Sequence, residues 1–287
     1  MPARTTSARS RWARLDPAEL AGLLLGVARL CLFFVITLMC IPLALLAAIH
    51  DPTGRRAYRV VRVWARLNVR LCGVTIQVDG CERLDPSAAY VFMSNHRSGF
   101  DVLALVVALE AFELHWVTKA ELGRIPGFGA ALRATKQIFV DRADHARAVA
   151  SLAAARGRIR SGSSVVFFPE GHRSDGPLLP FKKGGFVFAI ETDAPIVPIG
   201  ISGPPLLGPR GLLCRRHGTV RVVIRPPVPT AALEVADREA LLMRVRRSIV
   251  TAMHPPRRLV PDGGRRTLHL AARTGAVVHP FRPRHAS

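Results

Sequence analysis

A long apolar stretch near the N-terminus constrains the fold of this chain more than any other feature of its sequence. Residues 20–49 carry a single charge, that of Arg29, and residues 30–49 carry none. An α-helix of about 20 residues is roughly 30 Å long, which matches the hydrocarbon core of a bilayer. We therefore expect a membrane helix here, or a membrane-inserted pair of helices with a kink at Pro42.

Two other interpretations of the apolar stretch stay open, a cleavable signal peptide and the buried helix of a soluble protein. The stretch is long for the apolar part of a signal peptide. No small-x-small cleavage pattern follows it before Asp51 and Pro52. These observations count against the signal peptide, and the membrane helix is the interpretation that we prefer.

The segment that follows, residues 55–71, has the pattern of a basic amphipathic helix. Its arginines recur mostly at steps of three and four residues, and apolar residues lie between them. The arginines are Arg55, Arg56, Arg59, Arg62, Arg66 and Arg70. Each arginine near an anionic membrane contributes roughly 1 kcal/mol to binding. The pattern predicts contact with an anionic membrane surface, and a solvated helix face is the alternative.

The same arginines predict the side of the membrane on which the rest of the chain lies. Cytoplasmic flanks of membrane segments are enriched in Lys and Arg, so the downstream chain is expected on the cytoplasmic side of the inner cell membrane. Arginines in the basic N-terminal segment, residues 1–18, act in the opposite sense.

The net charge of +21 requires an anionic partner: nucleic acid, an acidic membrane surface or a phosphorylated substrate. Nucleic-acid binding is disfavoured because aromatic residues, which stack on bases, make up only 6% of the chain. The 49% of apolar residues exclude a disordered polycation. The five cysteines include no C-x-x-C pair, so we expect no metal site and no disulfide framework.

From residue 74 onward, short apolar runs alternate with stretches of helical period. This alternation predicts an α/β fold with a single mixed, largely parallel sheet flanked by helices, preceded by the membrane-associated helical segment. The expected strands are residues 74–78, 89–93, 114–118, 137–140, 164–168, 196–201 and 219–224. The expected helices are residues 101–111, 144–161, 183–192 and 232–253. The predicted domains are therefore a membrane-associated segment, 19–72, and a catalytic domain, 73–254, followed by a basic, disordered tail, 255–287.

His96 and Asp101 follow the second expected strand, where ligand sites of α/β sheets are found. An exposed histidine at a strand end can act as a general base, and a nearby carboxylate can orient its ring. Five residues on an ideal helix turn by about 500°, which would place the two side chains roughly 140° apart. The pair can meet only if a turn at Gly99 leads into the helix. A histidine that merely caps the helix is the alternative.

Three further points lie at strand ends. Arg142 follows the strand 137–140 and could bind a phosphate, or form a salt bridge with Asp141. The segment 168–185 turns at Gly171 and carries cations that could bind an anion or form a solvated loop. These cations are Arg173, Lys182 and Lys183. The apolar strand 196–201 contains Pro198, which is unusual for a central strand. Val197 and Pro198 could line an apolar channel or belong to the core.

These four segments, taken in order, resemble the glycerolipid acyltransferase family, which includes bacterial 1-acyl-glycerol-3-phosphate acyltransferases. Asn95, His96 and Asp101 match its N-H-x-x-x-x-D motif, and residues 139–142 match its F-(I/V)-D-R pattern. Residues 168–174 match F-P-E-G-T-R-S except at His172, and residues 197–203 match V-P-(V/I)-x-x-x-G. Four motifs in order are a specific signal over about residues 74–224.

The resemblance implies that His96 is the general base that deprotonates a glycerol hydroxyl and that Asp101 orients it. It implies an acceptor site with arginines on the phosphate and an acyl-binding region bordered by Val197 and Pro198. The acceptor residues it implies are Arg142, Glu170, Gly171, Arg173 and, less directly, Lys182. His172 departs from the usual threonine, which puts the acceptor preference in doubt.

The function that the resemblance implies is acyl transfer to 1-acyl-glycerol-3-phosphate, a lysophospholipid, to give phosphatidic acid. The donor would be acyl-CoA or acyl-carrier protein as co-substrate, with no other cofactor. The same chemistry on another lyso-lipid, such as a lyso-ornithine lipid, is the close alternative. A membrane-tethered nucleic-acid-binding protein and an inactive lipid-binding scaffold are the other classes, and the intact His96–Asp101 pair argues against the scaffold.

Overall fold

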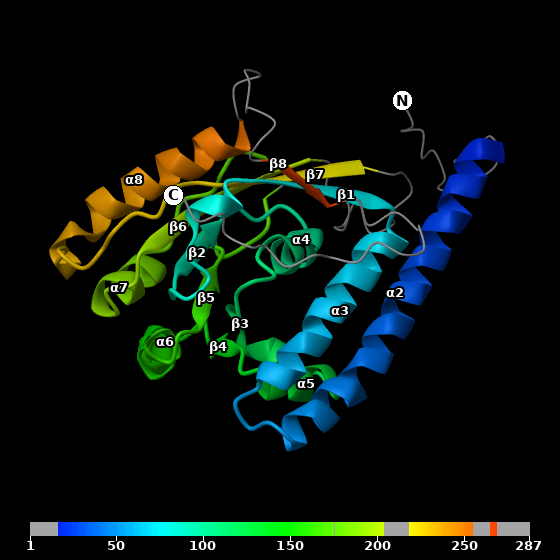
Figure 1. The fold of residues 1–287 in the computed structure, drawn as a ribbon, viewed down its shortest axis with the longest axis horizontal. Helices are drawn as coiled ribbons and strands as arrows, with labels where there is room; N and C mark the ends of the chain where they lie inside the picture. Colours follow the sequence, from blue (N-terminus) through cyan, green and yellow to red (C-terminus); the bar gives the residue numbers. More distant parts are fainter. Residues whose placement is uncertain (1–16, 175, 204–217, 255–264, 269–287) are drawn as a thin grey trace, which may run out of the picture.

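Figure 1 shows the computed structural model, which describes residues 17–174, 176–203, 218–254 and 265–268. The expectations for residues 1–16 and for most of the tail lie outside the described residues. The division into domains at residues 72 and 254 stays a prediction.

The described residues form an eight-stranded mixed sheet in the order β4-β3-β5-β2-β6-β7-β1-β8. β6 and β7, and β1 and β8, pair antiparallel, whereas the other neighbours are parallel. All seven predicted strands are present, and the predicted fold class is confirmed. The bounds are β1 Val74–Asp79, β2 Val91–Ser94, β3 Leu114–Lys119, β4 Ile138–Val140, β5 Ser164–Phe167, β6 Ile196–Ser202, β7 Gly218–Ile224 and β8 Arg265–Leu268.

Helices cover both faces of this sheet, which explains why its central strands β2 and β5 are buried at every position rather than at alternate ones. On β2, Phe92 packs into the cluster shared with α3 and α4, whereas Val91 and Met93 pack into the cluster shared with α6, α7 and α8. The bounds of these helices are α3 Arg55–Leu71, α4 Phe100–Ala108, α6 His145–Arg160, α7 Gly184–Glu191 and α8 Arg238–Met253.

Several short elements connect these layers. The sequence did not predict η1 (Cys81–Arg83), η2 (Ala120–Arg124) or α5 (Phe128–Ala134). The last long helix begins at Arg238 rather than at residue 232, because the 3-10 turn η3 (Val235–Asp237) precedes it. Glu234 and Asp237 close that turn with reciprocal hydrogen bonds to the backbone, and this capping arrangement sets where the helix starts.

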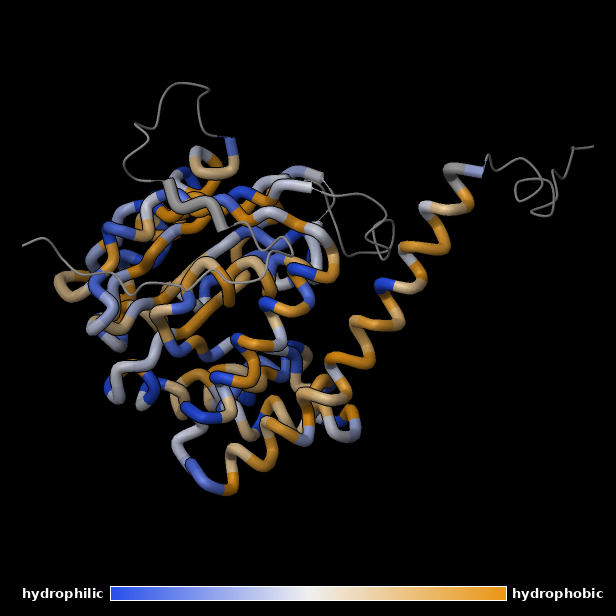
Figure 2. The backbone as a smooth tube through the Cα atoms, turned by 45° about the vertical axis from the view of Figure 1, so that its right-hand side comes forward, coloured by the Kyte–Doolittle hydropathy of each residue, from blue (hydrophilic) through white to orange (hydrophobic). Residues whose placement is uncertain are grey.

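The apolar stretch forms one element, α2 (Pro17–Ile49), with Pro42 inside it. Residues Leu20–Ile49 are long and apolar enough to cross a membrane, and few of them are buried against the rest of the protein. Figure 2 shows this apolar helix extending beyond the rest of the chain at its N-terminal end. The other half of α2 packs along α3, where the Trp64 indole donates to the Thr37 hydroxyl (2.9 Å) and contacts Phe33 edge-on.

The arginines of α3 divide into two groups, which corrects the prediction that all of them face lipid. Arg62 donates to the carbonyl of Phe112 (3.0 Å), Arg66 pairs with Glu110 (2.5 Å) and Arg55 lies 3.4 Å from Glu113. These three therefore attach α3 to the segment that connects α4 to β3. The exposed arginines of α3 that carry no such pair in the described structure are Arg56, Arg59 and Arg70.

The tail also departs from the prediction in one place. Residues Arg265–Leu268, expected to be disordered, form β8 and pair antiparallel with β1. An edge strand exposes a row of unpaired backbone groups, and β8 covers the outer edge of β1. A basic run of four residues carries too little apolar pattern to predict a strand.

Candidate active site

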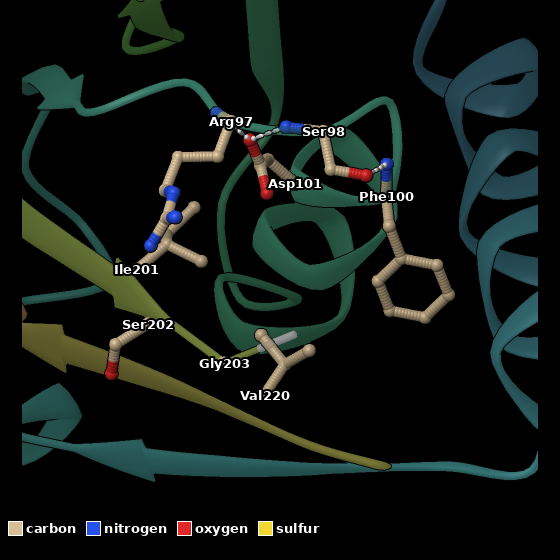
Figure 3. Close-up of a pocket in the computed structure, with 8 residues that line it drawn as sticks. All are labelled: Arg97, Ser98, Phe100, Asp101, Ile201, Ser202, Gly203 and Val220. Carbon is tan, nitrogen blue, oxygen red and sulfur yellow. Dashed lines mark hydrogen bonds between the residues drawn. The ribbon is translucent and has the colours of Figure 1, made fainter. Parts of the chain in front are cut away.

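The structure brings His96 and Asp101 together at the end of β2. The Nδ1 atom of His96 lies 2.9 Å from Oδ2 of Asp101. The same oxygen accepts the backbone N–H groups of Arg97 (2.7 Å) and Ser98 (2.8 Å), as Figure 3 shows. Gly99 precedes α4, so Asp101 stands in the first helical turn and folds back over the loop that carries His96.

This arrangement fixes what the histidine can do. A carboxylate oxygen only accepts hydrogen bonds, so the Nδ1 atom of His96 carries the proton and Nε2 of the neutral ring keeps its lone pair. The side chain of Asp101 is only 7% exposed and that of His96 is 14% exposed. The pair therefore combines an oriented base with a carboxylate that stabilises the imidazolium once a proton is taken.

Asn95 locks this loop to the neighbouring strand. Its side chain is fully buried, its amide nitrogen donates to the carbonyl of Ile201 (3.0 Å), and its oxygen accepts the N–H of Ile201 (2.7 Å). The sequence motif includes Asn95, but no role could be assigned to it from the sequence. The contact joins the end of β2 to β6 and so holds the base against the sheet.

Glu170 binds the backbone of two loop segments, and its predicted place among the acceptor residues stays a prediction. One of its carboxylate oxygens accepts the backbone N–H of His96 (2.8 Å) and the other accepts that of Leu179 (2.9 Å). The residue is 3% exposed. Because backbone amides engage both oxygens, Glu170 ties the segment 168–180 to the histidine loop, and Ser174 adds a bond from its N–H to the carbonyl of His96 (3.0 Å).

Cationic side chains gather where β2, β4 and β5 end. Gly171 stands in the left-handed region (φ +76°), and Arg142 donates to its carbonyl. Arg173 lies against the histidine loop, since a Cβ on Gly99 would be 3.4 Å from its guanidinium. The stem of Lys182 lies beside Gly171 in the same way.

Partial desolvation lowers the pKa of Arg142 from its ordinary value, and the charge of Glu121 raises it. The guanidinium remains cationic at neutral pH. Sequence reasoning missed Lys119, an exposed cation that ends β3 at this same edge of the sheet. Its position at the end of a predicted strand could have identified Lys119, as the same position identified Arg142.

Val197 and Pro198 do not lie at this edge. Both are buried within β6, between β2 and β7. Pro198 faces Arg225, which lies one residue beyond the end of β7, and its carbonyl accepts the N–H of Arg225. The N–H that proline lacks would therefore fall where the pairing of β6 with β7 stops, so the strand tolerates the proline. Their part in acyl binding stays a prediction.

The end of the same strand does contribute to a small hollow beside Asp101. Figure 3 shows the Arg97 side chain extending toward Ile201 there. The lining residues are Arg97, Ser98, Phe100, Asp101, Ile201, Ser202, Gly203 and Val220. Within the described residues no group of three or more His, Cys, Asp or Glu side chains could hold a metal ion.

Comparison with known proteins identifies similar chains. Residues 75–202 match the family model described as Acyltransferase. The chain is 33% identical over 200 residues to the human protein named 1-acyl-sn-glycerol-3-phosphate acyltransferase alpha, covering 67% of this chain and 68% of that one. It is 33% identical over 222 residues to the chloroplastic 1-acyl-sn-glycerol-3-phosphate acyltransferase LPAT1 of Arabidopsis thaliana, covering 75% of this chain and 60% of that one.

A solved structure shows the same fold. The 1-acyl-sn-glycerophosphate (LPA) acyltransferase PlsC from Thermotoga maritima superimposes with a TM-score of 0.65 at 24% identity. The match covers 82% of this chain and 96% of that one.

Proposed function

This chain belongs to the 1-acyl-sn-glycerol-3-phosphate acyltransferase family, and we propose that it transfers a fatty acyl group to the free hydroxyl of 1-acyl-glycerol-3-phosphate. The product is phosphatidic acid. The observation that carries the proposal is the buried His96–Asp101 pair, which leaves one imidazole nitrogen as a base at the cationic edge of the sheet.

His96 acts on the acceptor in this mechanism. Its Nε2 takes the proton of the lyso-lipid hydroxyl as the hydroxyl oxygen attacks the thioester carbonyl of the donor. The new C–O ester bond forms, the C–S bond breaks, and the imidazolium returns its proton to the departing thiolate. General-base assistance of this kind is worth roughly 10²- to 10⁴-fold in rate. The donor is acyl-CoA or acyl-carrier protein, and no further cofactor is needed.

The phosphate of the acceptor binds the cations around Gly171. Arg142 donates to the carbonyl of Gly171, the stem of Lys182 lies beside Gly171, and Arg173 lies beside Gly99 on the histidine loop. An arginine fork suits a phosphate better than a neutral or zwitterionic head group. This charge favours lysophosphatidic acid over a lyso-ornithine lipid. Glu170 supports the site through its bonds to the backbone.

The membrane supplies the lipid acceptor. We place α2 in the inner cell membrane and the catalytic domain on its cytoplasmic side, with an anionic surface as the partner of Arg56, Arg59 and Arg70. The apolar helix and these exposed arginines support this placement. No nucleic-acid partner is needed to account for the charge.

The test is an acceptor and donor survey with the purified full chain in lipid nanodiscs. Lysophosphatidic acid, lyso-ornithine lipid and lysophosphatidylcholine are each offered with acyl-CoA and with acyl-carrier protein, and products are identified by mass spectrometry. The proposal expects the highest kcat/KM with lysophosphatidic acid. A higher value with lyso-ornithine lipid would assign the chain to the alternative acceptor, and transfer to none of them would refute the activity.

A further inference from the structure

We infer that Phe168 is a positioning residue that holds the imidazole ring of His96 in the orientation needed for proton transfer. This inference rests on the acyl transfer proposed above. Phe168 follows β5 directly, and β5 is the neighbour of β2 in the sheet. The segment that binds the backbone of His96 through Glu170 therefore also presents an aromatic ring to its side chain.

The two rings lie face to face. Their centroids are 3.9 Å apart and their planes differ by 11°. Trp116, on the next strand β3, stacks on Phe168 in turn, at 5.7 Å and 30°. Each ring is therefore supported by the strand beside it, and the series of three rings ends at the catalytic histidine.

The hydrogen bond to Asp101 does not by itself define the plane of the imidazole. A single contact at Nδ1 fixes one atom and leaves the ring free to tilt about that contact. A flat surface against the ring face removes this freedom and sets the direction of the Nε2 lone pair. A misplacement of about 1 Å at a reacting group can cost roughly 100-fold in rate, so the orientation has a large kinetic consequence.

One turn makes both attachments. The N–H of Gly171 donates to the carbonyl of Phe168 (3.0 Å), which closes residues 168–171 into a turn, and Gly171 supplies the positive φ. Glu170 on this turn binds the backbone of His96, and Phe168 covers its ring. The segment thus fixes the base at two points, while Arg173 just beyond it remains exposed for the acceptor.

Phe167 provides a matched control within the same segment. It is the preceding residue, is also phenylalanine, and points to the opposite face of the sheet, where it packs against Phe188 of α7. Replacing it removes the same number of atoms from a core position that has no contact with His96 among the described interactions.

The kinetic test compares Phe168→Leu, Phe168→Tyr and Phe167→Leu in the full chain, with rates normalised to the folded fraction from circular dichroism. Phe168→Leu should lower kcat by about 10- to 100-fold, with the acceptor KM within about twofold of wild type. Phe168→Tyr keeps the aromatic face, so its kcat should stay close to that of wild type. Phe167→Leu should reduce the folded fraction without lowering the normalised kcat. An unchanged kcat in Phe168→Leu, or an effect confined to KM, would overturn the positioning role.

A second measurement does not depend on activity. In histidine-labelled protein, the ring current of a stacked phenyl group shifts the ring protons of His96 upfield, and this signal is identified by its loss in His96→Gln. The shift should vanish in Phe168→Leu and persist in Phe168→Tyr. Its absence in wild type would refute the stack itself, whereas failure of the wild type to acylate lysophosphatidic acid would refute the proposed function and leave this readout intact.

Discussion

Lowering the pH from 7.5 to 5.0 should destabilise the folded chain through His115, a buried residue of β3. The residue is 2% exposed, and its Nδ1 lies 3.0 Å from the carbonyl of Lys136, to which it donates. Burial, together with the charge of Arg158, lowers the pKa of this histidine from 6.5 to about 4. The folded chain therefore holds His115 neutral at a pH where the unfolded chain binds a proton.

The sign and the size of the effect follow from this difference. Between pH 6.5 and 4 the unfolded state carries the extra proton, so the free energy of unfolding falls as the pH falls through this window. The whole shift from 6.5 to about 4 corresponds to about 3 kcal/mol. About 2 kcal/mol of it has been lost by pH 5.0. Well above pH 6.5 His115 is neutral in both states and contributes no slope.

The assay is urea unfolding of the full chain in detergent micelles, followed by circular dichroism at a series of pH values. His115→Gln keeps a side-chain donor for Lys136 and removes the titration, so its stability should depend less on pH than that of wild type by about 2 kcal/mol at pH 5.0. His145→Gln, an exposed position on α6, is the matched control and should follow wild type. Equal losses in wild type and His115→Gln would show that this histidine is not the source of the acid sensitivity.

Three further predictions concern the active site. His96→Ala should abolish acyl transfer while the chain stays folded and bound to vesicles, because only the base is removed; retained turnover in a product assay would eliminate the mechanism. Arg173→Ala should raise the acceptor KM by about tenfold and the donor KM much less, since it loses a charge-assisted bond to phosphate, whereas Arg244→Ala on α8 should change neither. Equal increases in both KM values for Arg173→Ala would argue against a phosphate role. Asn95→Ala should lower the free energy of unfolding by about 2–4 kcal/mol, because it leaves the N–H and C=O of Ile201 buried without partners; a loss below about 0.5 kcal/mol in urea unfolding would show that water replaces the amide.

The sheet could be predicted from the sequence because its strands are short runs rich in Val, Ile and Phe that are separated by turn residues. The meeting of His96 and Asp101 could be anticipated for a similar reason, since a turn that leads into a helix is a local property of the chain. The freedom of a glycine is not needed for it, because Gly99 has ordinary helical angles (φ −60°, ψ −20°). The local sequence pattern was enough to predict those contacts that join residues close together in the chain.

The features that the sequence did not predict depend on contacts between distant segments. In the sequence Glu170 is an acid close to Arg173. In the structure its carboxylate accepts the backbone N–H of His96, which lies 74 residues earlier. The arginines of α3 all recur with the same helical spacing. Nothing in the local sequence distinguishes Arg66, which pairs with Glu110, from Arg59, which remains exposed. Only the packing of α3 on α4 assigns these charges to protein or to solvent.

The ion pairs of α3 have a consequence for how a lipid reaches the base. α3 packs along α2 on one side and is bound by Arg62 and Arg66 to the catalytic layer on the other, so the anchor and the sheet are joined side by side and not by a tether. With α2 in the bilayer, as proposed, the height of His96 above the lipid plane is a fixed property of the molecule. The enzyme then meets its acceptor by lateral diffusion in two dimensions, at one depth and in one orientation of the head group.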